Sequence, residues 1–152
     1  MKSIIGLIDE LETKFPFMDQ KKESVSAASV GWHIEHSLLA VIKMISATEH
    51  SNPADYKWQF NIKRSLVILT NKFPRGRARA PQSVMPGEQI SRTTIAPLLE
   101  KAKQKAVLFE TLGKDKFFHH LVFGNLRLRQ ARKIILIHTQ HHLSIIKDII
   151  RG

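Results

Sequence analysis

Residues 125–150 read NLRLRQARKIILIHTQHHLSIIKDII. Apolar side chains recur along this segment in steps of three and four residues, which is the spacing of one face of an α-helix. Two histidines fall on the same face, so the predicted buried stripe consists of Leu128, Ala131, Ile135, His138, His142, Ile145 and Ile149. We therefore expect one long helix from an Asn125 N-cap to about Ile150, with His138 and His142 on its buried side.

The N-terminal third of the chain is also patterned as helix. A short helix is predicted over residues 2–14, and it should end before Phe15-Pro16 because the residue preceding a proline avoids the α region. Ser24 or Ser26 is expected to cap a second helix that continues to about Glu49.

Two more helices are predicted in the middle of the chain. Asn52-Pro53-Ala54-Asp55 indicates the start of a third helix, because Asn favours the N-cap and Pro the first helical position. Its apolar stripe, expected to face the core, is Trp58, Ile62, Leu66, Leu69 and Phe73. A proline-rich loop is predicted over 74–91, and a fourth helix over 94–113.

Length and composition predict one all-α domain covering 1–152. With 152 residues, 43% of them hydrophobic, the chain can bury one core. No long uncharged apolar run is present, so we expect a soluble, cytoplasmic protein with no membrane partner. Cysteine is absent, and any transition-metal site must therefore use His, Asp or Glu.

The chain is strongly basic, with 24 Lys and Arg against 13 Asp and Glu, a formal net charge of +11. Such a charge promotes nonspecific association with anions and nucleic acids. The densest basic segment is the loop 72–79, which has no zinc-finger or RNA-binding pattern beside it. We expect no specific nucleic-acid partner, and whether this loop binds anything is left open.

Three histidines are predicted to meet at one divalent metal ion. Residues four apart on a helix have neighbouring side chains, so His138 and His142 can bind the same ion. A third ligand should come from the second helix, where His36 shares a face with Trp32, while His33 lies about a quarter turn away. Zn²⁺ is the first expectation, with Ni, Fe or Mn as alternatives. The competing interpretation is that these are core histidines bonded to backbone carbonyls.

Catalytic residues are less clearly indicated. Glu35 is next to His36 and could be a general base, a hydrogen-bond acceptor beside the metal, or an exposed helix carboxylate. His120 is a second candidate in the region before the last helix, and His141 is expected on the flank of the predicted ligands.

Three segments together resemble the DinB/YfiT-like superfamily. Residues 31–38, GWHIEHSL, are similar to its Trp-x-x-x-His segment, and residues 138–143, HTQHHL, resemble its His-x-x-x-His segment. Residues 120–126, HLVFGNL, look like a His-Pro-x-Phe-Gly-x-Leu segment of an uncharacterised branch. The resemblance implies a DinB-like four-helix bundle with a short additional N-terminal helix, and a metal held by His36, His138 and His142.

Three functions are consistent with these features. The first is a metal-dependent hydrolase or thiol-dependent transferase, whose small-molecule substrate would be anionic if the basic loop contributes to binding. The second is a metal- or ligand-binding module without turnover, which could act as a homodimer. The third is a basic helical nucleic-acid-binding protein with structural histidines.

Overall fold

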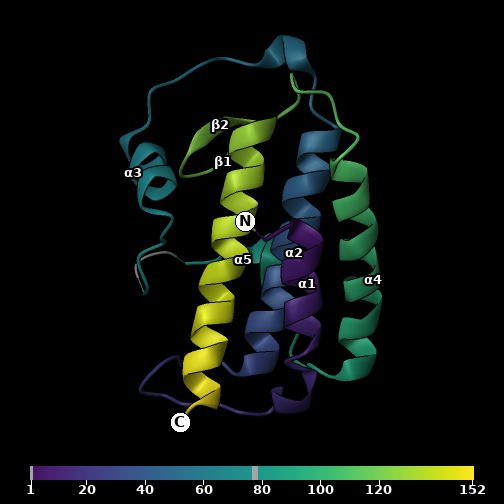
Figure 1. The fold of residues 1–152 in the computed structure, drawn as a ribbon, viewed down its shortest axis with the longest axis vertical. Coiled ribbons are helices and arrows are strands. Elements are labelled where there is room, and N and C mark those ends of the chain that lie inside the picture. Colours follow the sequence, from purple (N-terminus) through teal and green to yellow (C-terminus); the bar gives the residue numbers. More distant parts are fainter. Residues whose placement is uncertain (1, 77–78) are drawn as a thin grey trace.

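The computed structural model describes residues 2–76 and 79–152, so Arg77 and Ala78 of the basic segment 72–79 lie outside the described residues. The described residues form helices α1 (Ile4–Glu12), α2 (Val30–Glu49), α3 (Ile62–Thr70), α4 (Arg92–Phe109) and α5 (Leu128–Ile150), and strands β1 (Phe117–His120) and β2 (Gly124–Arg127) (Figure 1).

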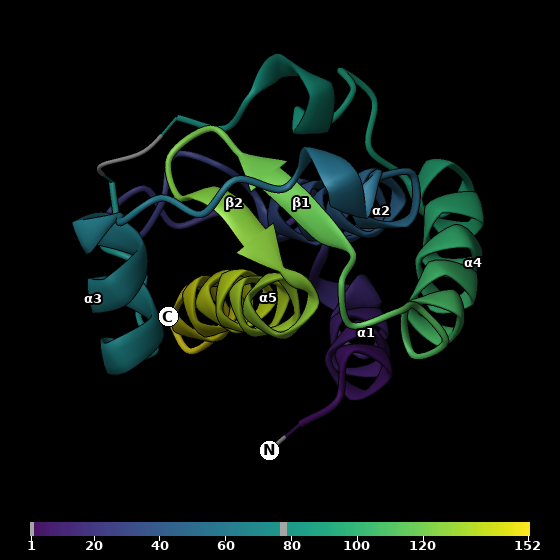
Figure 2. The same ribbon diagram turned by 90° about the horizontal axis from the view of Figure 1, so that it is seen from above.

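Four of the helices pack lengthwise around one core. α2 packs against α4 and α5, and α1 packs against the same two helices. Seen from the end, these four surround the core while α3 lies outside it, beside α5 (Figure 2). The mostly helical architecture is confirmed, and the closer likeness to a DinB bundle stays a prediction. In the part of the chain that the structure describes, no helix is long and apolar enough to cross a membrane.

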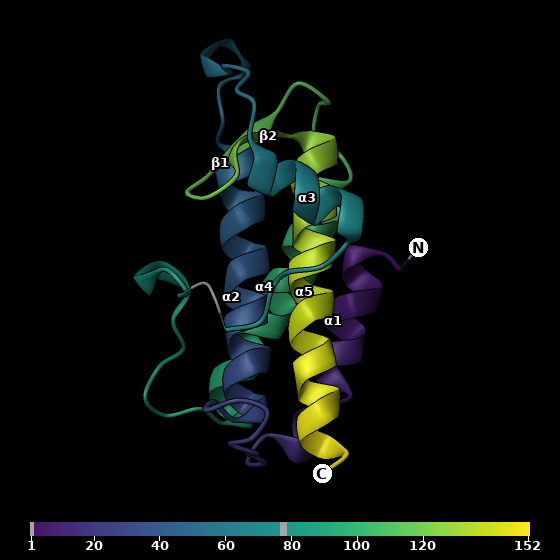
Figure 3. The ribbon, with the colours of Figure 1, turned by 90° about the vertical axis from the view of Figure 1, so that its left-hand side faces the viewer.

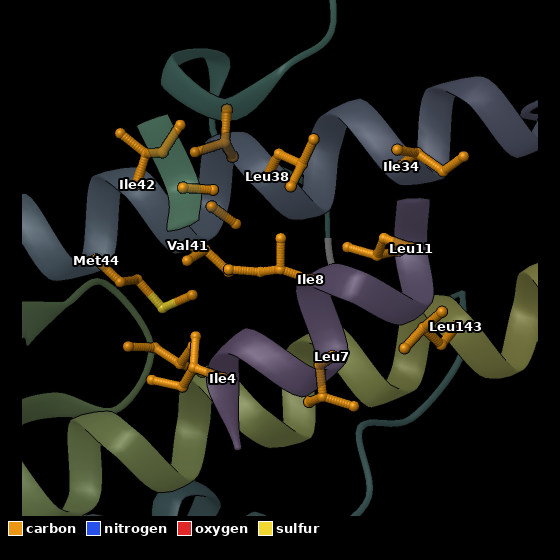
Figure 4. Close-up of a cluster of buried hydrophobic side chains, with 14 of the residues drawn as sticks. Ile4, Leu7, Ile8, Leu11, Ile34, Leu38, Val41, Ile42, Met44 and Leu143 are labelled. Carbon is orange, nitrogen blue, oxygen red and sulfur yellow. The ribbon is translucent and has the colours of Figure 1, made fainter. Parts of the chain in front are cut away.

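The short helix α1 supplies one wall of this core. Its buried residues recur at helical spacing and are Ile4, Leu7, Ile8 and Leu11. Ile8 points toward Leu38 and Val41 of α2, whereas Leu7 points toward α5 (Figure 4). Burying a Leu or Ile side chain contributes about 1.5–3 kcal/mol, so four such residues fix α1 against the longer helices.

The long helices begin later than the sequence indicates. α2 is capped by Ser29, whose Oγ accepts a hydrogen bond from the backbone N of Trp32, so the predictions of Ser24 and Ser26 are wrong. Ser26 lies in a turn closed by a bridge between Lys22 and Ser26, and its Oγ accepts from Ala28 N instead. Because Ser29 rather than Ser26 caps α2, the Ser26 hydroxyl can form a hydrogen bond with a side chain of α2, that of His33.

A β-hairpin corrects the purely all-α prediction. β1 and β2 pair antiparallel, with Phe117 opposite Arg127 and His120 opposite Gly124. Gly124 has a φ of +69°, a left-handed conformation that glycine adopts without strain. Asn125 therefore belongs to β2, and α5 begins at Leu128 rather than at an Asn125 cap. The two strand sequences, FFHH and GNLR, do not alternate apolar and polar residues, so the sequence pattern does not reveal them.

The third helix is the largest departure from the prediction. Pro53 begins only a three-residue 3₁₀ turn, and α3 starts at Ile62, where Asn61 Oδ1 accepts from Arg64 N. The stripe predicted to face the core is mostly exposed, with 71% exposure at Trp58 and 79% at Leu69. Ile62 and Leu66 are exposed as well, so this apolar face has no partner among the described residues.

The opposite face of α3 attaches it to the fold. Arg64 is 5% exposed and donates through Nη1 to the carbonyls of Phe123 and Asn125, and through Nη2 to that of Gln59. A buried guanidinium needs such partners, and only this orientation of the helix supplies them. Arg64 and Val67 are therefore the residues of α3 that are buried.

The segment between α3 and α4 runs along the outer side of α2 (Figure 3). It contains a 3₁₀ turn at Gln82–Val84, and the side chain of Val84 is buried against the core. The segment predicted as a long loop thus packs against α2 at the level of the histidines.

Candidate metal centre

Two of the predicted ligands stand one turn apart on α5. The ring centroids of His138 and His142 are 4.7 Å apart. His142 is 8% exposed, and His138 is partly exposed. Both occupy the predicted stripe because a spacing of four residues returns a side chain to the same side of the helix. The pair therefore faces α2 rather than solvent.

The third ligand comes from α2. Nε2 of His36 lies 3.3 Å from Nε2 of His138, and the rings of His36 and His142 have centroids 4.6 Å apart. One ring nitrogen of each of the three residues lies within 4.8 Å of the others. The three histidines that the sequence predicts to meet, His36, His138 and His142, are thus close together and could bind a metal ion. They are called the trio below.

The distances fit coordination of a single ion. Two imidazole nitrogens bonded to one ion at about 2.1 Å are about 3.0–3.4 Å apart for octahedral or tetrahedral angles. The 3.3 Å between His36 and His138 lies in that range. One ring nitrogen of His142 lies within 4.8 Å of the nitrogens of the other two histidines, which is longer than this range allows if the full 4.8 Å separates them.

A backbone carbonyl sets the protonation of His36. Its Nδ1 lies 2.9 Å from the carbonyl oxygen of Val84, in the 3₁₀ turn above α2. A carbonyl can only accept, so Nδ1 carries the proton and the lone pair is on Nε2, which faces His138. Trp32 stacks on the same ring, with centroids 4.9 Å apart and planes inclined by 16°. His36 is therefore fixed in both orientation and tautomer.

His142 is oriented by a residue that the sequence analysis did not select. Nδ1 of His33 and Nδ1 of His142 share a hydrogen bond of 2.9 Å, and Nε2 of His33 lies 2.9 Å from Ser26 Oγ. If protons are donated along this chain from His142 to His33 to Ser26, the lone pair of His142 lies on Nε2. The sequence feature that could have indicated this role for His33 is its position three residues before His36 on the same helix.

Burial keeps these imidazoles neutral. It lowers the pKa of His33 to about 4 and that of His138 to about 3, with a further contribution from the neighbouring His36 in both cases. Burial also lowers the pKa of His36, and burial and then His138 lower that of His142. A neutral imidazole has the lone pair that a metal needs, so protons do not compete for the site near neutral pH.

His138 differs from the other two candidate ligands in its surroundings. Its Nδ1 is buried and has no hydrogen-bond partner among the described residues. The ring of Phe73 meets it edge-on, with centroids 6.0 Å apart. His138 therefore lacks an orienting hydrogen bond at its second ring nitrogen, unlike His36 and His142.

The two catalytic candidates lie outside the trio. Glu35 is 7% exposed, so the exposed-carboxylate interpretation is wrong, and its Oε1 accepts from Gly87 N at 3.2 Å. Its Oε2 is buried with no partner in the described part of the chain. His120 accepts through Nδ1 from the backbone N of Val122 and Phe123, which stabilises the hairpin turn. Neither is among the residues whose ligand atoms converge.

Arg75 of the basic segment is hydrogen-bonded to α5. Nη2 of Arg75 donates to Ser144 Oγ and to Asp148 Oδ2, each at 2.8 Å. His141, on the same side of α5, is partly exposed, and burial followed by the charge of Arg75 lowers its pKa. Arg75 and its partner Asp148 thus place an ion pair on the side of α5 next to the predicted ligands.

Comparison with protein-family models, curated proteins and solved structures found no match for this chain. The interpretation of the site consequently depends on its geometry.

Proposed function

We propose that His36, His138 and His142 bind one divalent transition-metal ion, with Zn²⁺ as the first candidate. The observation that carries this proposal is the convergence of the three imidazoles together with the hydrogen bonds from His36 to Val84 and between His142 and His33. Metal-ligating histidines characteristically bond through their other nitrogen in this way. Histidines that only fill a core have no reason to direct their ring nitrogens at one point.

We further propose that the centre is catalytic, in a metal-dependent hydrolase or a thiol-dependent transferase. Three protein ligands leave coordination positions for water or substrate, as in catalytic zinc sites, and a bound ion would lower the pKa of water or a thiol there. The resemblance of residues 31–38 and 138–143 to the DinB/YfiT-like superfamily supports the same interpretation. The partial exposure of His138 gives small molecules a side from which to approach.

Metal content tests the first proposal. Protein dialysed against excess Zn²⁺ and then against buffer should retain one ion per chain, measured by elemental analysis. The double variant His138→Ala, His142→Ala should retain less than a tenth of this amount. The matched control His50→Ala, His119→Ala removes two exposed histidines and should keep the wild-type content. Equal content in all three proteins would show that the trio is not the site.

Turnover tests the second proposal. Small esters, amides and thiol conjugates would be screened with zinc-loaded protein, and activity should disappear in His36→Ala and not in His50→Ala. Activity that persists in His36→Ala would contradict a catalytic role for this metal, even if the ion is bound.

A further inference from the structure

A cavity of about 450 Å³ opens beside the candidate metal centre. Its walls come from two segments, the residues that follow α3 and the outer side of α5. The lining residues used below are Lys72, Phe73, Arg75, Gln140, His141 and Ser144. Sites for small molecules measure about 300–1,000 Å³, so this cavity has room for a metabolite-sized ligand.

The cavity borders the predicted ligands through two side chains. Phe73 lies with its ring centroid 6.0 Å from that of His138 and 6.0 Å from that of His141. The ring of His141 is in turn 5.1 Å from that of His142. Phe73 and His141 thus line the cavity and also contact the predicted ligands, so a ligand in the cavity lies close to the metal centre.

The charge of the cavity selects for anions. Lys72 and Arg75 line it, and none of the described lining residues is acidic. Asp148 bonds to Arg75 and offsets one of these positive charges, while Lys72 keeps the wall positive. Gln140 and Ser144 add uncharged hydrogen-bonding groups. A cation would be repelled by Lys72, and an apolar ligand would leave these groups without partners.

Arg75 is held in place for such a role. Both of its hydrogen bonds, to Ser144 and to Asp148, use Nη2. Among the described residues, no partner is bonded to its Nη1 or Nε. A guanidinium anchored through one nitrogen keeps donors for an oxyanion and loses little side-chain entropy when the anion binds.

We infer that this cavity binds a carboxylate or phosphate group of the substrate, through Arg75 and Lys72, and so places the rest of a small anionic molecule toward the metal centre. The inference names the substrate class of the site proposed above and rests on that proposal for the reaction. The binding of the anion itself does not depend on the metal and can be measured without it.

Inorganic phosphate is the probe. Metal-free protein would be titrated with phosphate at constant ionic strength, followed by ¹H–¹⁵N NMR. We expect saturable shifts at the amides of Arg75, Gln140 and Ser144. Arg75→Gln should raise the Kd about tenfold, since it removes charge-assisted hydrogen bonds. The matched control Arg132→Gln removes another arginine paired with a carboxylate, Glu110, away from this cavity and should leave the Kd unchanged.

A further variant separates binding from disruption of the fold. Asp148→Asn removes the carboxylate that competes for the guanidinium of Arg75, so it should lower the Kd for phosphate. A higher Kd in Asp148→Asn, an equal loss in Arg75→Gln and Arg132→Gln, or the absence of saturable shifts would overturn the inference. Metal content is measured separately. If the protein binds zinc but not phosphate, only the inference about the cavity is contradicted. If it binds phosphate but not zinc, only the proposed metal-binding function is contradicted.

Discussion

Mild acid should destabilise the metal-free protein through its buried histidines. Burial lowers the pKa of His33 to about 4, whereas a solvent-exposed histidine has a pKa of about 6.5. Below pH 6.5 the unfolded chain therefore binds a proton that the folded chain excludes. Stability is fully present above that pH and is lost as pH falls toward the folded pKa, at about 1.4 kcal/mol per pH unit for each such histidine.

The size of the effect follows from the same values. Between pH 8 and pH 5, His33 alone should remove about 2 kcal/mol from the free energy of unfolding. His138, with a pKa of about 3, titrates in the same direction and should remove a similar amount. These two histidines together should remove about 4 kcal/mol, a large fraction of the 5–15 kcal/mol typical of a domain, and His120 adds to the loss because its pKa is also lowered to about 4. Carboxylates protonate mainly below pH 5, so this range isolates the histidines.

Urea unfolding followed by circular dichroism, with a chelator present, measures this loss at pH 8, 6 and 5. His33→Gln should reduce the pH slope by about one proton. His50→Gln, which replaces an exposed side chain, should keep the wild-type slope. A free energy of unfolding that does not change between pH 8 and 5 would refute the assignment of neutral, buried imidazoles.

Three further predictions concern the orientation of His142, the difference between exposed and buried leucines, and the attachment of α3. His33→Phe should weaken Zn²⁺ binding about 10–100-fold without abolishing it, measured by competition with a chromophoric chelator, because His142 loses its orienting bond. Leu69→Ser should change the free energy of unfolding by less than about 0.5 kcal/mol, whereas Leu38→Ala should cost about 2–5 kcal/mol, because only Leu38 is buried. Arg64→Met should increase hydrogen exchange in β1, β2 and α3 and leave α2 protected, because three backbone carbonyls lose their hydrogen-bond donor. Equal exchange in all four elements would contradict this.

The candidate ligands could be predicted because helical spacing determines which side chains share a face. His138 and His142 are four apart in an apolar stripe, and His36 belongs to the face of α2 that meets α5. The contribution of His33 could not be predicted in this way. It depends on a hydrogen bond between two particular ring nitrogens, and spacing does not specify a tautomer.

α3 shows the converse limit. Its apolar stripe identifies residues on one side of a helix, and it does not say whether that side meets a core. The helix is instead oriented by Arg64, which donates to the carbonyl of the nearby Gln59 and to two carbonyls of the hairpin, at Phe123 and Asn125, which are far away in the sequence. Hydrogen bonds of a buried arginine to distant backbone carbonyls can therefore decide which face of a helix is buried, and here Leu66 and Leu69 are left exposed.

X-ray absorption at the zinc edge tests the central claim most directly, because it counts the imidazoles bound to the ion. The account predicts three imidazole nitrogens at about 2.0–2.1 Å in the zinc-loaded protein, and a loss of this signal in His138→Ala, His142→Ala. A spectrum with one imidazole or none, or the same spectrum in the double variant, would contradict it.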